Sequence, residues 1–160
     1  MVDCNYCTKS DKVIKMKVES SKNLKRYNHL IGELDAAYHE ASLKLGVSDS
    51  ISKILYTICN CGTSCLLNEI SKQTGLSRQT VNSAIRNLES DGIIYLKNVN
   101  AKAKEVCLTE KGLAAAKNTA MKIIAMENDI LASWTEDEVQ NYLNMTERFL
   151  ADLKERVKQL

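Results

Sequence analysis

Four polar side chains recur at helical spacing near the middle of this 160-residue sequence. They follow the i, i+3, i+4, i+7 pattern of one helix face and are Gln79, Asn82, Ser83 and Arg86. Val81, Ile85 and Leu88 lie between them and form a second, apolar face. Amide side chains can pair with adenine, and a guanidinium group can pair with guanine or with phosphate. The pattern predicts a helix from Ser77 to Ser90 that packs on a core and offers its polar face to DNA bases.

Further polar and basic residues flank this predicted helix. Ser77 and Thr80 begin it, and Lys72 and Arg78 are suited to contacts with phosphates. The candidates in the segment that follows the helix are Lys97, Asn98, Asn100, Lys102 and Lys104. A thin cationic ribbon of this kind can reach a minor groove. The alternative to a DNA-binding site is a solvated helix followed by a surface hairpin. That alternative explains why these side chains are polar, but not why a polar helix is followed directly by a basic hairpin.

Six cysteines form a second set of reactive side chains. Cys4 and Cys7 have the spacing of a metal knuckle, and the two further ligands that zinc needs could come from a second copy of the chain. Cys59, Cys61 and Cys65 cluster at a predicted helix end, which makes them candidates for redox sensing. The alternative is an N-terminal arm without structure and small buried thiols that pack as apolar side chains.

Residues in a catalytic arrangement are not recognisable. The sequence has no glycine-rich phosphate loop, no Ser/His/Asp spacing and no paired carboxylates in an apolar setting. A cysteine nucleophile near His29 stays open as an alternative without a supporting motif, and a thiol with a strongly depressed pKa would favour it. We therefore predict a protein that is not an enzyme and that needs no cofactor.

Charge is unevenly distributed, although the formal net charge is only +2. Residues 71–111 include seven basic and four acidic side chains, whereas residues 121–160 include five basic and eight acidic ones. This asymmetry fits a nucleic-acid-binding lobe beside an assembly lobe, and ordinary solvated charge is the alternative. No apolar run approaches the roughly 20 residues of a membrane span, and residues 1–17 lack the apolar stretch of a signal peptide. We expect a cytoplasmic protein with reduced thiols and no membrane contact.

The elements that must position the polar helix can be predicted from periodicity and capping residues. A helix that begins at Ser48 or Ser50 should end near Cys61 and Gly62. A short helix over 66–74 and a four-residue turn precede the Ser77 helix, which is the order of a helix-turn-helix. Strands at 93–97 and 105–108 should follow, joined by a polar turn at 98–103.

Long helices are predicted on both sides of this segment. Apolar residues from Leu24 to Leu45 recur at alternating steps of three and four, and Gly46 follows them. Thr109 can begin a long helix that runs from Glu110 to about Ser133. Thr135 and Glu138 have the spacing of a capping box, so a last helix should begin there.

Together these elements predict a mainly α-helical fold with a small β-hairpin wing. The expected parts are an N-terminal arm (1–20), a dimerisation helix (21–47), a winged helix-turn-helix DNA-binding domain (48–112) and C-terminal dimerisation helices (113–160). The apolar faces of 24–45 and 139–160 carry more apolar surface than one subunit can cover. An obligate homodimer is therefore expected.

Residues 66–112 resemble the winged helix-turn-helix of the multiple-antibiotic-resistance regulator (MarR) family. The resemblance is carried by LSRQTV at 76–81, LESDGII at 88–94 and VCLTEKG at 106–112. It extends over about 24–160, because that family has a long first helix and two long C-terminal helices. In one respect the sequence departs from the family: Asn100-Ala101-Lys102 stands where Asp-x-Arg is usual at the wing tip, and lysine fits a narrow minor groove less well than arginine.

The resemblance implies a function as well as a fold. It implies a homodimer with interlocked first and last helices, with the Ser77 helix in the major groove, that is released from DNA by a small phenolic or lipophilic effector. The leading hypothesis is thus a transcription regulator, on the family pattern a repressor, that binds a pseudo-palindromic operator in double-stranded DNA. One alternative is a thiol- or metal-responsive member of the same family. Another is a winged-helix protein-interaction module without DNA binding, which would show an apolar outward face on that helix.

Overall fold

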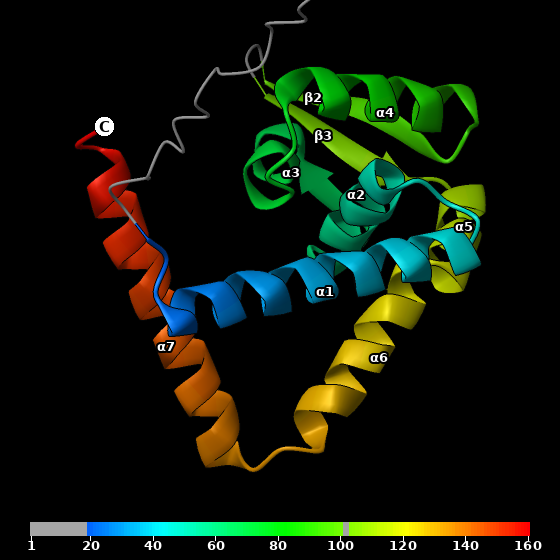
Figure 1. The fold of residues 1–160 in the computed structure, drawn as a ribbon. Coiled ribbons are helices and arrows are strands. Elements are labelled where there is room, and N and C mark those ends of the chain that lie inside the picture. The colour runs from blue at the N-terminus through cyan, green and yellow to red at the C-terminus, as the bar shows by residue number, and fades with distance from the viewer. Residues whose placement is uncertain (1–18, 101–102) are drawn as a thin grey trace, which may run out of the picture. The chain divides into compact units, whose positions relative to one another are not determined.

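A computed structural model describes residues 19–100 and 103–160 of the protein (Figure 1). The described residues divide into two units, with the boundary in the sequence between Ala37 and Tyr38. Helix α1 (Lys22–Lys44) begins in the first unit and ends in the second. None of the helices in the two described ranges combines the length and apolar character that a bilayer crossing requires.

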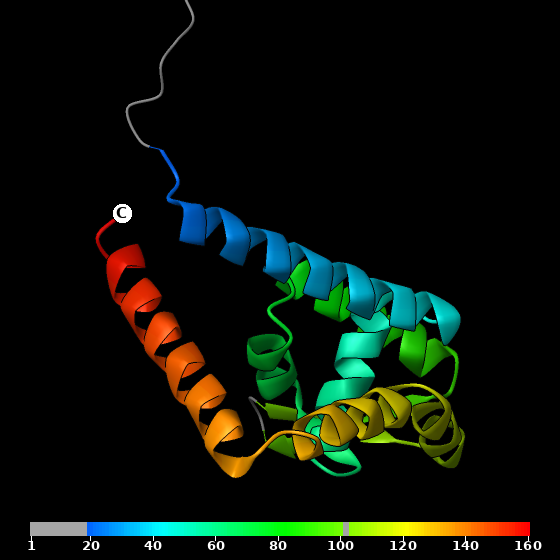
Figure 2. The same ribbon diagram turned by 60° about the horizontal axis from the view of Figure 1, so that its bottom comes forward.

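Three helices and a small sheet form most of the core of the larger unit. The helices are α2 (Asp49–Asn60), α3 (Leu67–Gln73) and α4 (Arg78–Ser90). Their apolar faces meet with strand residues in a cluster whose most deeply buried members are Ile54, Leu55, Ile58, Ile70, Val81, Ile94 and Val106. Figures 1 and 2 show these helices gathered around the strands. The spacing of apolar residues therefore predicted the buried side of each helix correctly.

Three antiparallel strands form the sheet, in the order β1-β3-β2. They are β1 (Ser64–Leu66), β2 (Ile94–Asn100) and β3 (Ala103–Leu108). The sequence did not predict β1, because three residues directly before a helix show no alternation that could be recognised. Leu66, expected as the first residue of the short helix, is instead the last residue of β1 and the N-cap of α3.

The two wing strands are longer than predicted. Asn98 pairs with Lys104 and Asn100 pairs with Ala103, so most of the predicted polar turn is part of the hairpin. A register shift lies between Asn98 and Asn100. The prediction was wrong because it took the polar segment that begins at Asn98 as a turn, whereas backbone pairing continues among solvated side chains.

The long helix predicted from Glu110 to Ser133 is two helices. These are α5 (Glu110–Asn118) and α6 (Ala120–Ala132), and Thr119 between them has φ −130° and ψ −94°. The buried Thr119 hydroxyl donates to the carbonyl of Ala115 at 2.8 Å. The break lets α5 contact β3 while α6 contacts α2. No glycine or proline marks it in the sequence, so its cause is packing rather than propensity.

The last helix, α7 (Glu136–Val157), begins with the predicted capping box. The Thr135 hydroxyl accepts the backbone N–H of Glu138 at 3.3 Å, and the Glu138 carboxylate accepts the backbone N–H of Thr135 at 2.8 Å. The latter hydrogen bond is the main reason that the pKa of Glu138 lies below its usual value. Before the helix, Trp134 packs edge-on against Tyr142 with ring centroids 5.5 Å apart. No residue of α7 is buried.

One carboxylate links three helices within the larger unit. Glu127 of α6 accepts hydrogen bonds from the hydroxyls of Tyr38 in α1 and Tyr56 in α2, the latter at 2.5 Å. The hydrogen bond to Glu127 and burial raise the pKa of Tyr38, and burial together with Glu127 raises that of Tyr56. Both phenols therefore remain hydrogen-bond donors at neutral pH. This contact helps to fix α2, and through it the helix-turn-helix, against α6.

Candidate nucleic-acid interface

The turn between α3 and α4 is set by local hydrogen bonds. The Thr74 hydroxyl donates to the carbonyl of Ile70 at 2.8 Å, and Gly75 follows with φ +65°, a conformation that favours glycine. Leu76 is half-buried and packs against the core. These contacts set the direction in which α4 leaves the turn, as expected of a helix-turn-helix.

Two of the predicted interface residues form the beginning of α4. The Ser77 side-chain oxygen accepts the backbone N–H of Thr80 at 3.1 Å and lies 2.8 Å from the Thr80 hydroxyl. This is an N-cap, which stabilises the helix by satisfying a free N–H group. Ser77 thus has a structural role in addition to any contact with a ligand.

The two faces of α4 are those that the sequence predicts. Val81, Ala84, Ile85 and Leu88 are buried. The predicted polar residues on the outer face are all exposed: Arg78, Gln79, Thr80, Asn82, Ser83 and Arg86. The structure therefore brings one continuous set of amide, hydroxyl and guanidinium groups to the surface of a single rigid helix.

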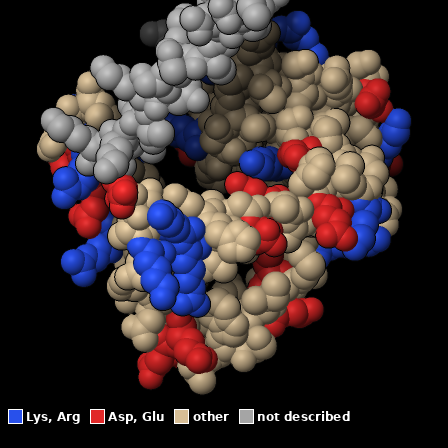
Figure 3. All heavy atoms as spheres, in the orientation of Figure 1, with Lys and Arg blue, Asp and Glu red and all other residues tan. Residues whose placement is uncertain are grey.

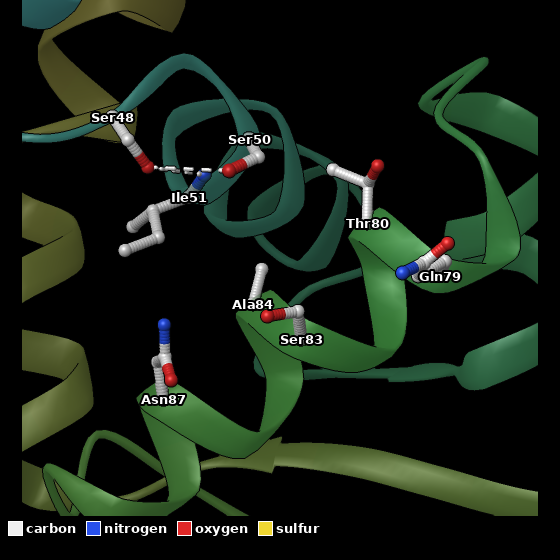
Figure 4. A pocket seen from close by; sticks show the side chains of 8 residues that line it. All are labelled: Ser48, Ser50, Ile51, Gln79, Thr80, Ser83, Ala84 and Asn87. Atoms are coloured by element: carbon white, nitrogen blue, oxygen red, sulfur yellow. Dashed lines mark hydrogen bonds between the residues drawn. The ribbon is translucent and has the colours of Figure 1, made fainter.

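Part of this polar face borders an open pocket of about 320 Å³ at the beginning of α2. Figure 4 shows side chains of α4 on the side that faces Ser48 and Ser50. Those of α4 that line it are Gln79, Thr80, Ser83, Ala84 and Asn87. Asn82 and Arg86 do not line the pocket, so only one side of the continuous polar face borders it.

Asn87 was not among the predicted site residues. It continues the row of Thr80 and Ser83 by one helical turn, so helical spacing alone could have identified it. Ser48 and Ser50 were predicted only as helix caps. Their position beside α4 depends on how α2 packs against α4, which the sequence does not contain.

Two of the predicted cations already have acidic partners. Lys72 lies 2.9 Å from Glu69 on the same helix, and Lys97 lies 3.7 Å from Glu105 across the wing strands. Glu105 also accepts a hydrogen bond from Ser64 at 2.7 Å. These ion pairs lower the positive potential that a phosphate would meet at Lys72 and Lys97.

Other predicted cations are free of such partners. Arg78, Arg86 and Lys104 are exposed and make no ion pair with any residue in 19–100 or 103–160. Figure 3 shows basic and acidic side chains interspersed over the face in view, without a large area of one sign. Among the described residues, Arg78, Arg86 and Lys104 are therefore predicted cations whose charge is not offset by an ion pair.

The wing presents Asn98 and Lys104 opposite each other, with Asn100 nearer the tip. All three are exposed. Lys102 lies outside the described residues, and so does the second residue of the Asn100-Ala101-Lys102 sequence. Of the predicted wing contacts in this paragraph, the structure therefore describes Asn98, Asn100 and Lys104.

The structure describes some of the predicted cysteine sites and not others. Cys61 and Cys65 are in contact, with their sulfurs 2.6 Å apart, whereas half-buried Cys59 packs against the core. Cys4 and Cys7 lie outside the described residues. Within the described part of the chain, no three His, Cys, Asp or Glu side chains are grouped closely enough to hold a metal ion.

Comparison with known proteins identifies this architecture. A family model described as a winged helix-turn-helix DNA-binding domain matches residues 47–95. A MarR family regulator from Neisseria meningitidis, NMB1585, has a TM-score of 0.77 at 16% identity, over 87% of this chain and 99% of the other. This chain has the winged-helix fold of the MarR family. The fold class and the resemblance predicted from the sequence are thereby confirmed.

Two further solved structures have a similar fold. S. aureus MepR in complex with DNA has a TM-score of 0.62 at 18% identity, over 84% of this chain and 99% of the other. The transcriptional regulator PcaV from Streptomyces coelicolor, in complex with its natural ligand, has a TM-score of 0.60 at 17% identity, over 84% and 98%. No curated protein sequence matches this chain significantly.

Proposed function

We propose that this protein is a sequence-specific DNA-binding transcription regulator that acts as a homodimer. The observation that carries the proposal is the exposed polar face of α4, which combines amides and arginines on a winged helix-turn-helix. A helix of this kind fits the major groove, where amide and guanidinium groups can distinguish base pairs. A protein-binding winged helix would present apolar side chains there instead, and α4 presents none.

The proposal also assigns each predicted contact a role. Gln79, Asn82, Ser83 and Arg86 would contact base edges, while Arg78 and Lys72 would contact phosphates. The wing residues would approach the neighbouring minor groove, and these are Lys97, Asn98, Asn100, Lys102 and Lys104. Because a two-fold dimer presents two equal helices, the operator should be a pseudo-palindrome with half-sites about one helical turn apart.

Control by a small molecule is part of the same proposal. PcaV, which shares the fold, was solved with its natural ligand, and MepR was solved with DNA. We infer that this chain likewise has a DNA-bound state that a small lipophilic or phenolic effector releases, and that it represses transcription. Its place of action would be the cytoplasm, where the operator is accessible.

Selection of bound sequences from a random pool of duplex DNA tests the proposal. We expect a pseudo-palindromic motif to be enriched, and binding to the motif to weaken as salt rises. Arg86→Ala should relax the preference at one position of the motif, whereas Lys122→Ala, a change of an exposed cation on α6, should retain the full motif. Recovery of no common sequence by the unaltered protein, or binding equal to that of unrelated DNA, would contradict sequence-specific recognition.

A further inference from the structure

Two cysteines meet at the junction between α2 and the sheet. Cys61 is the C-cap of α2, and Cys65 is the central residue of β1, where it pairs with Val106 of β3. Gly62 between them has φ +108°, a backbone conformation that lets the chain fold back on itself. The Cys61 and Cys65 sulfurs lie 2.6 Å apart as free thiols. A disulfide bond spans about 2.05 Å, so little movement separates contact from bond.

The two thiols have different surroundings. Cys61 is exposed, whereas Cys65 is buried. Burial, followed by the hydrogen bond with Cys61 and the charge of Cys61, raises the pKa of Cys65 to about 12. Cys65 therefore keeps its proton at neutral pH and can donate it toward the Cys61 sulfur. This arrangement leaves Cys61 as the thiol of the pair that a dissolved oxidant can reach.

Cys59 and Cys107 lack this combination of access and a partner thiol. Burial raises the pKa of the half-buried Cys59. Cys107 is buried on β3, opposite Tyr95, whose hydroxyl is hydrogen-bonded to it. Among the described cysteines, only Cys61 and Cys65 therefore combine an accessible thiol with a partner thiol in contact with it.

We propose that Cys61 and Cys65 form a reversible disulfide when the protein meets a hydroperoxide. The Cys61 thiolate attacks the outer peroxide oxygen, the O–O bond breaks, and the departing alkoxide or hydroxide takes up a proton. Cys61 is then a sulfenic acid. Cys65 attacks its sulfur, an S–S bond forms, and the hydroxyl leaves as water with the proton of Cys65. Two thiols and one hydroperoxide thus give one disulfide, one water and one alcohol, or two waters when the oxidant is hydrogen peroxide.

This inference goes beyond DNA binding and does not require it. The disulfide would join the end of α2 to β1, one residue before α3 is capped by Leu66. A bond here closes a short loop at the base of the wing and next to the helix-turn-helix. A reducing compartment would return the pair to thiols, as is usual for a disulfide that acts as a signal.

Counting alkylated cysteines tests the proposal without DNA. Trypsin releases residues 54–72 as one peptide, which contains Cys59, Cys61 and Cys65. The full chain is treated with hydrogen peroxide, unfolded, alkylated with iodoacetamide, digested and analysed by mass spectrometry. We expect three alkyl groups on this peptide before oxidation, one after oxidation, and three again when a reductant precedes alkylation. The peptide 105–111, with Cys107, should stay alkylated throughout.

Single substitutions identify the pair. Oxidised Cys59→Ala should carry no alkyl group on this peptide, and Cys61→Ala should keep two. Cys65→Ala should keep one, on Cys59, with Cys61 held as a sulfenic or higher acid because no second thiol can displace its hydroxyl. The unaltered chain and Cys59→Ala suffice if Cys65→Ala does not fold. The proposal is overturned if peroxide leaves all three sites alkylated in the unaltered chain. It is also overturned if peroxide no longer removes two alkyl groups from the peptide of Cys59→Ala. A disulfide between this peptide and another one, or conversion of Cys61 only to sulfinic or sulfonic acid, would overturn it as well.

Discussion

Asn82 and Arg86 lie on the part of the α4 surface that the pocket does not include. Both are exposed, so neither supports the fold and a change at either should act on binding alone. We expect Asn82→Ala and Arg86→Ala each to cost about 1–3 kcal/mol per subunit contact on the selected operator and to relax preference at one position. Affinity for unrelated duplex DNA should change much less. Fluorescence anisotropy with both kinds of DNA measures this difference.

Lys104→Ala serves as the control that distinguishes contacts with base edges from charge interactions with phosphates. Lys104 is an exposed cation of the wing without an acidic partner among the described residues. Its loss should weaken binding to all sequences alike and reduce the salt dependence by about one unit per contact. Our assignment is wrong if Asn82→Ala and Arg86→Ala leave the selected motif unchanged while Lys104→Ala alters it.

The ion pair between Lys72 and Glu69 leads to a second prediction for single residues. Lys72 was predicted to contact phosphate, but Glu69 lies 2.9 Å away and competes for it. We expect Glu69→Gln to increase affinity for any duplex DNA several-fold, because it frees Lys72 and removes an acidic group. Lys72→Ala should then have a larger effect in the Glu69→Gln background than alone. Equal effects in the two backgrounds would show that Lys72 does not contact phosphate.

For single residues, the sequence predicted several roles that depend only on neighbours within the same helix. Ser77, Thr135 and Glu138 were predicted as capping residues because caps depend on neighbours within one turn. The exposed face of α4 was predicted for the same reason. Ser48 and Ser50 reach the site through packing, and the pair of Glu105 with Lys97 depends on strand register, so neither was predicted. The pair of Glu69 with Lys72 was also missed, although its i, i+3 spacing on one helix could have identified it.

Among the elements, the junction between the wing and α5 depends on the absence of a side chain at Gly112. The Thr109 hydroxyl caps α5 by accepting the N–H of Gly112 at 2.9 Å and also donates to the carbonyl of Gly92 at 2.7 Å. A Cβ atom at Gly112 would lie 1.9 Å from the carbonyl oxygen of Ile93. That oxygen belongs to the backbone and accepts the N–H of Thr109 at 3.0 Å, so it cannot easily move.

We therefore expect Gly112→Ala to destabilise the protein by about 2–3 kcal/mol, as overpacking against a fixed group does. Helix propensity alone would give the opposite sign, since alanine favours a helix over glycine by about 0.5–1 kcal/mol. Ala114→Gly, at an exposed position of α5, measures that propensity effect in the same helix. Urea unfolding of the three proteins provides the free energies. Stabilisation by Gly112→Ala would show that α5 can shift away from Ile93.

The differences between predicted and observed elements share a physical origin. The glycines at 46 and 75 end helices as expected because a positive φ is a local requirement. The break at Thr119, strand β1 and the full length of the wing are set by contacts between distant segments, and a window along the sequence does not contain those contacts. The VCLTEKG segment was recognised through its resemblance, but its physical reason, the approach of Gly112 to Ile93, required the structure.

For the whole molecule, the main question is what covers the apolar side chains of the terminal helices. Helix α7 has no buried residue, and its exposed apolar side chains include Tyr142, Leu143, Phe149, Leu150, Leu153 and Val157. Exposed apolar side chains also follow α1 within the first unit, at Leu24, Tyr27, Ile31 and Leu34. Monomeric proteins rarely expose apolar patches of this extent, and a two-fold dimer covers such a patch with its own copy.

We expect the protein to be a dimer at micromolar concentration and Leu153→Asp to break it. Leu153 is 48% exposed in the single chain, so its side chain is available for burial between subunits. Burying a leucine contributes about 1.5–3 kcal/mol, and two-fold symmetry applies the loss twice. Dimer affinity should thus fall by roughly two orders of magnitude or more, and DNA affinity with it, because one subunit spans only one half-site.

Ala151→Asp introduces the same charge on the opposite side of α7 and should leave the dimer intact. Sedimentation velocity, with circular dichroism to check folding, measures both variants. A stable folded monomer of the unaltered protein would exclude the dimer, and equal weakening by the two variants would exclude this face of α7 as its interface.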